Sequence, residues 1–193
     1  MIDHQALEQR RHAAHHEAAH AVVAYWFGWW VNHEGTSIWS YDVPGVPDGG
    51  RDYTGMRCQV WAYTTQARAC VSHAGWLAET ILRPGLSTRE DEKLARQIDE
   101  LQWQDEADDP DDAHDTLRAL IEANPHMSAQ DLLGEYRRYE TETLAILNRP
   151  EVWQSIERVA HALLAKGRLT GDEVEACLAD GVRYGAFSPL GGV

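Results

Sequence analysis

The chain has 193 residues, 44% of them hydrophobic, which is enough for one packed domain. Its 17 Lys and Arg against 31 Asp and Glu give a formal net charge of −14, which argues against nucleic-acid binding. The three cysteines, Cys58, Cys70 and Cys177, form no C-x-x-C pair and do not resemble a disulfide framework. We expect a cytoplasmic protein with one domain over residues 1–180 and a loose tail over 181–193.

The N-terminal sixteen residues are polar and lack the apolar core of a signal peptide. The longest apolar run, AVVAYWFGWWV at 21–31, is shorter than the roughly 20 residues that cross a bilayer. We therefore expect no transmembrane segment.

In chain order, the pattern predicts many helices and two short strands, a mainly α fold with a small β-sheet (α+β). Residues 3–28 contain almost no helix breaker and many alanines, which predicts one long helix. Residues 36–41 and 52–60 carry β-branched and aromatic side chains, and the Pro- and Gly-rich segment between them predicts a loop. Further helices are predicted over 64–82, 89–104, from about 112, 129–148, 150–167 and 170–180.

The acidic segment DEADDPDDAHD, residues 105–115, contains a proline and is predicted to be a solvated loop that leads into the helix near Asp112. A calcium site is the alternative, but the carboxylates do not have the spacing of an EF-hand.

His16, Glu17 and His20 form the pattern H-E-x-x-H inside the first predicted helix. Residues four apart share a helix face, so both imidazoles can bind one metal ion, while Glu17, about 100° away, can reach a water molecule on that metal. A zinc ion with three protein ligands leaves a position for water and lowers its pKa to about 7. The pattern thus predicts a catalytic zinc site with Glu17 as general base. The alternative is an accidental match in a helix rich in histidine.

A third zinc ligand is not evident close to the motif. The histidine that metzincins place six residues after the second motif histidine is replaced by Trp26. A downstream glutamate is available at Glu34, but a turn and a strand surround it, which is an unfavourable setting for a helical ligand.

Four segments in the same order resemble the peptidase domain of FtsH-type zinc metalloproteases. They are HEAAHAVV at 16–23, AGWLAE at 74–79, LST at 86–88 and EDEKLA at 90–95. The resemblance extends, weakly at single positions, over roughly residues 10–180. It implies a helical zincin domain that binds one catalytic Zn²⁺ ion.

The resemblance also implies specific roles for two acidic residues. Asp91, four residues before Ala95, matches the family's aspartate ligand, and Glu79 matches the glutamate that helps to orient the site without binding the metal. The chain departs from the family at Ala19 and Trp76, where the family has glycine and arginine. It also departs over 99–127.

The chain carries no G-x-x-x-x-G-K-[ST] motif, so we expect a stand-alone peptidase domain without the family's ATPase module. The expected function is ATP-independent, zinc-dependent endopeptidase activity on unfolded peptides or flexible segments, with substrate pairing along the strand at 36–41. A homo-oligomer or a separate partner protein could deliver substrate. The alternative is a non-catalytic or weakly active module that binds proteins through Trp-rich surfaces. Glu17 favours the enzyme, because a structural zinc site does not need it.

Overall fold

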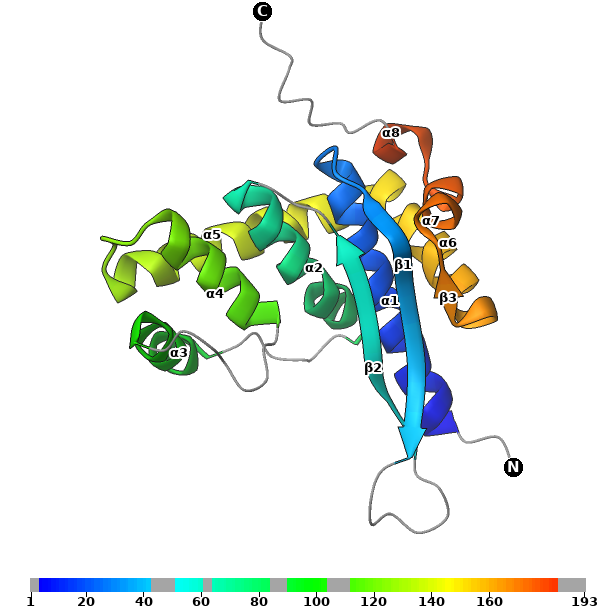
Figure 1. Ribbon diagram of the computed structural model, residues 1–193, viewed down its shortest axis with the longest axis horizontal. Helices are drawn as coiled ribbons and strands as arrows, with labels where there is room; N and C mark the ends of the chain where they lie inside the picture. The colour runs from blue at the N-terminus through cyan, green and yellow to red at the C-terminus, as the bar shows by residue number, and fades with distance from the viewer. Residues whose placement is uncertain (1–3, 43–50, 61–63, 84–89, 104–111, 184–193) are drawn as a thin grey trace, which may run out of the picture.

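The computed structural model describes residues 4–42, 51–60, 64–83, 90–103 and 112–183 (Figure 1). Within these residues the helices surround one central helix, and a small sheet lies along one side of it. The elements are α1 (His4–Trp26), β1 (Val31–Asp42), β2 (Arg51–Val60), α2 (Thr65–Leu82), α3 (Asp91–Trp103), α4 (Asp112–Ala123), α5 (Ala129–Leu147), α6 (Pro150–Lys166), β3 (Arg168–Leu169), α7 (Gly171–Cys177) and α8 (Asp180–Arg183). The prediction of a mainly α fold with a small β-sheet is confirmed.

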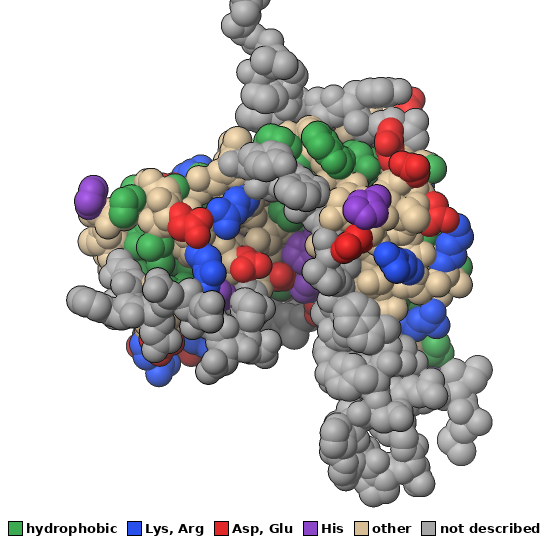
Figure 2. Space-filling view, in the orientation of Figure 1, with side chains coloured by type: hydrophobic (Ala, Val, Ile, Leu, Met, Phe, Trp, Pro, Cys, Tyr) green, Lys and Arg blue, Asp and Glu red, His purple; other side chains and the backbone are tan. Residues whose placement is uncertain are grey.

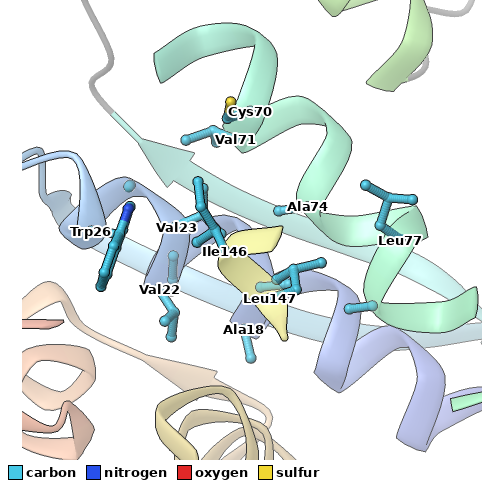
Figure 3. Packing of buried hydrophobic residues seen from close by; sticks show 14 of the residues in the cluster. Ala18, Val22, Val23, Trp26, Cys70, Val71, Ala74, Leu77, Ile146 and Leu147 are labelled. Atoms are coloured by element: carbon cyan, nitrogen blue, oxygen red, sulfur yellow. The ribbon is translucent and has the colours of Figure 1, made fainter. Parts of the chain in front are cut away.

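Helix α1 is the centre of the core because most of its residues from Ala13 onward are buried, and many of them are alanine or valine. α2, α6 and both long strands pack against it. Figure 3 shows side chains of α1, α2 and the end of α5, among them Val22, Ala74 and Leu147, in one hydrophobic cluster. The motif residues Glu17 and His20 are buried within the same part of the helix.

Three helices begin at side chains that cap them. Thr64 and Ser128 accept hydrogen bonds from the first turns of α2 and α5, and Thr170 forms a capping box at the start of α7. Pro150 is the first residue of α6, where its missing N–H costs nothing. Residues 105–111 of the acidic segment and the tail from 184 onward lie outside the described residues.

The sheet has the order β2-β1-β3, with antiparallel pairing throughout. β1 is its central strand, because Thr36 and Ser37 pair with β2 on one side and with β3 on the other. The prediction that residues 36–41 accept a substrate strand is therefore wrong at these positions. In the described part of the chain, β2 pairs with β1 alone, and its other edge meets no strand.

Helices α2, α4 and α5 form a layer beside α1, and α3 packs outside them against α4 and α5 (Figure 1). This arrangement brings the middle of α2 and the first residue of α4 next to the motif histidines of α1. None of the described helices combines the length and the apolar character that a membrane crossing requires.

Candidate metal centre

His16, Glu17 and His20 lie together on α1 as the motif predicts. One ligand atom from each of them lies within 4.8 Å of the others. The two imidazole rings meet edge to face with their centroids 4.7 Å apart. In Figure 2, acidic and histidine side chains come together in a recess near the middle of the face shown.

Both imidazoles are held by hydrogen bonds through Nδ1. The Nδ1–H of His16 donates to Oε1 of Glu79 over 2.6 Å, and the Nδ1–H of His20 donates to the backbone carbonyl of Val71 over 2.6 Å. Because Nδ1 carries the proton in these bonds, the lone pair of each neutral ring is on Nε2. Metal-binding histidines typically have such a partner behind the ring. The predicted contact between Glu79 and the site is therefore present.

Asp112 of α4 faces both Nε2 atoms. Its Oδ2 lies 3.1 Å from Nε2 of His16 and 3.5 Å from Nε2 of His20. Asp112 is the first residue of α4, where the helix dipole favours a carboxylate. Two imidazole nitrogens and one carboxylate oxygen thus converge on one point, the ligand set of a catalytic zinc with an open position.

The predicted place of Asp91 is wrong. Its carboxylate, 65% exposed, pairs with the guanidinium of Arg137 at 2.5 Å, at the start of α3. Arg137 lies on α5 and also pairs with Glu140 of the same helix at 2.6 Å. The ion pair between Asp91 and Arg137 therefore connects α3 to α5. Asp112, 24% exposed, occupies the position that was expected for Asp91.

Glu17 is buried beside the histidines, with only 3% of its surface exposed. Burial raises the pKa of its carboxyl to about 7, although the two histidines act in the opposite direction. Its Oε2 has no hydrogen-bond partner. A buried carboxylate oxygen without a partner is costly, which indicates a place for a water molecule or a cation.

The residues present fit a divalent metal ion. The donors are two neutral nitrogens and one anionic oxygen, which suit zinc. Helix α2 presents no side chain to the Nε2 atoms, because Gly75 faces them; a Cβ at that position would lie 2.5 Å from Nε2 of His20. His16, His20 and Asp112 would hold the ion, and Glu17 would stay free for chemistry.

Without a metal, the same groups attract one another as charges. Burial alone would lower the pKa of His16, but hydrogen bonds to Asp112 and Glu79 raise it to about 10. The pKa of His20 is also raised, against its burial, by the charge of Asp112. Burial would raise the pKa of Asp112, but the two histidines hold it well below its ordinary value.

Asp112 and Gly75 are the residues of the site that sequence reasoning missed. Asp112 stands in an acidic run with several carboxylates at adjacent positions, and the predicted helix start at 112 was the one signal that singled it out. Gly75 falls inside a predicted helix, and a glycine there is unfavourable unless something approaches closely.

Neither the scan against protein-family models nor the search of curated proteins finds a match for this chain. The resemblance to FtsH-type peptidases therefore stays a prediction from the sequence, and the functional conclusion depends on the geometry of the site.

The first prediction separates the two aspartates. Asp112→Asn removes the anionic donor beside both Nε2 atoms, so the zinc affinity should fall by about 10- to 100-fold or more. Asp91→Asn is the matched control, because it removes only a surface ion pair worth about 0–1 kcal/mol. Zinc titrations of both purified variants measure the difference. A normal affinity in Asp112→Asn, with a loss in Asp91→Asn, would restore the original assignment.

The second prediction concerns pH and the metal-free protein. The pKa of His16 is raised from 6.5 to about 10, so its stabilising contribution is complete below pH 6.5 and is lost as the pH rises through 10. Burial raises the pKa of Glu17 from 4.5 to about 7, so it adds a further loss of stability as the pH rises between these two values. Urea unfolding with a chelator should show stability falling from pH 5 to pH 10. Added zinc should stabilise more at pH 8 than at pH 6, because it competes with protons for His16 and His20.

Proposed function

We propose that this chain is a zinc-dependent endopeptidase that cleaves unfolded peptides and flexible segments without ATP. One observation carries the proposal: Nε2 of His16, Nε2 of His20 and Oδ2 of Asp112 converge beside the buried carboxylate of Glu17. A structural zinc site needs the ligands alone, whereas a hydrolase also needs a base that is not a ligand.

Each side chain of the site has a separate task in this reaction. A bound zinc ion supplies Lewis acidity, which polarises the scissile carbonyl and acidifies a water molecule. Glu17 accepts a proton from the attacking water and later donates it to the leaving amine. Burial favours the protonated form of this carboxyl, which suits a group that must hold the proton between the two transfers. Glu79 and the carbonyl of Val71 keep the rings of His16 and His20 oriented throughout.

The edge of β2 that meets no other described strand is the best candidate for binding the peptide backbone. Cys58 of β2 pairs with Thr36 of β1, and α1 packs against β2. Burial raises the pKa of the Cys58 thiol well above its ordinary value, and the nearby carboxylate of Glu17 raises it further. This part of β2 is therefore close to the proposed base. A peptide that adds to the edge as a strand would lie extended along β2, which runs beside α1 (Figure 1).

Pairing along a strand edge restricts the substrates to extended chains. A typical folded domain is more stable than its unfolded form by about 5–15 kcal/mol, so little of it is extended at any moment. The chain carries no phosphate-binding loop motif that would couple ATP hydrolysis to unfolding. We therefore expect unstructured peptides and flexible tails to be the substrates.

The third prediction tests the base. Glu17→Gln keeps the size of the side chain but cannot accept a proton, so peptide hydrolysis should fall by at least about 100-fold. Zinc content should stay at one ion per chain, because Glu17 is not a proposed ligand. Activity against a quenched fluorescent peptide and metal analysis of the same sample provide the measurement. Equal rates for parent and variant would mean that the observed cleavage comes from another site or a contaminant.

The fourth prediction tests the substrate class. An unfolded casein-like protein should be cleaved, a stable folded domain should stay intact, and a zinc chelator should stop the cleavage. ATP should change nothing. Cleavage that survives the chelator, or that ATP stimulates, would contradict the proposal. A protein that binds zinc but cleaves no peptide would instead favour the binding-module alternative.

A further inference from the structure

Three residues of α2 at four-residue spacing, Val71, Gly75 and Glu79, form one stripe that faces the histidines of α1. The outer two bind the Nδ1 atoms: Glu79 binds that of His16, and the carbonyl of Val71 binds that of His20. Gly75 lies between them, one turn from each, and faces the Nε2 atoms of both rings. The stripe therefore contacts each imidazole at Nδ1 and leaves space beside Nε2.

Gly75 is not needed for the backbone conformation of α2. It lies inside a regular helix, and its φ is not in the left-handed region that favours glycine. Alanine is a better helix former at such a position. The need for glycine comes from its neighbours, because a Cβ would lie 2.5 Å from Nε2 of His20 and at least as close to the ring of His16. Real Cβ atoms essentially never come so close to another atom, so something would have to move.

The two imidazoles cannot move away without losing other contacts. Each ring is fixed through Nδ1 by a hydrogen bond of 2.6 Å, and α1 is buried around them. A Cβ at position 75 would also lie at nearly equal distance from both Nε2 atoms, the two atoms that a shared ion would have to contact. Zinc–nitrogen distances are about 2.0–2.1 Å, so a methyl group this close to both nitrogens would crowd an ion bound between them.

We propose that Gly75 is a positioning residue for the metal: its missing side chain keeps the space in front of the two Nε2 atoms open. This inference rests on the proposed function, because it takes His16 and His20 as ligands. A side chain at position 75 blocks metal uptake or turns the rings, although no atom of Gly75 binds the ion.

Gly134 offers a matched control in the same chain. It also lies inside a helix, α5, but a Cβ there would meet nothing within 4 Å. Gly134→Ala therefore reports the effect of the glycine-to-alanine change on a helix, without the contact with histidine.

The experiment compares the parent, Gly75→Ala and Gly134→Ala. Zinc affinity is measured by competition with a chromogenic chelator, and the ligand geometry by the visible absorption spectrum of bound Co²⁺. The parent and Gly134→Ala should bind one ion with equal affinity and equal spectra. Gly75→Ala should lose at least about 100-fold in zinc affinity and show an altered or absent Co²⁺ spectrum. Parent-like affinity and spectrum in Gly75→Ala would overturn the inference.

A double-mutant cycle keeps the test valid if Gly75→Ala folds poorly. Gly75→Ala is combined with the variant His16→Ala/His20→Ala, because the added Cβ would meet both rings. The urea midpoints of all four metal-free proteins are compared. The alanine at position 75 should lower the midpoint less when both rings are absent. An equal loss in both backgrounds would overturn the steric basis of the inference. If the parent itself takes up no metal, the proposed function fails, and the cycle still reports whether Gly75 makes room for the two imidazoles.

Discussion

The site depends on the close packing of α1 against α2. His20 reaches the carbonyl of Val71 and His16 reaches Glu79, which requires the two helices to run antiparallel with their backbones near each other. Gly75 of α2 makes this approach possible, because a Cβ at that position would collide with both rings. α6 and the sheet cover other sides of α1, so both imidazoles are oriented before any ligand binds.

The local part of this arrangement could be predicted from the sequence. The helical repeat alone places His16 and His20 on one face and Glu17 beside them, because the positions are one turn apart. Helix caps such as Thr64 and Thr170 are equally local, since each satisfies N–H groups only three residues away. The placement of the motif residues on one helix was predicted because no distant part of the chain decides it.

The third proposed metal ligand, Asp112, could not be found from such local patterns. Asp91 and Asp112 each begin a helix with an acidic first turn, so their local signatures are the same. What separates them is which helix packs beside α2. α3 buries Leu94 and Ile98 and lies on the outside of α4 and α5, whereas α4 itself packs against α2. The helix that follows the LST segment therefore places its acidic residue, Asp91, in a surface ion pair with Arg137. The next helix, α4, supplies the carboxylate at the site, that of Asp112.

The balance of charge explains why these groups belong together. Glu17, Glu79 and Asp112 surround two imidazoles in a partly buried recess, and buried carboxylates are costly unless cations or protons compensate them. Protonated imidazoles would compensate the charge of these carboxylates only at a pH at which each ring carries a second proton. A divalent cation would compensate the same charge with both rings neutral. Glu79 has the Nδ1–H of His16 as its partner in either state, whereas Asp112 would face protonated rings in the first state and the cation in the second. Glu17 is the carboxylate whose Oε2 lacks a hydrogen bond, and burial raises the pKa of its carboxyl. The environment of Glu17 therefore suits a general base better than a fourth metal ligand.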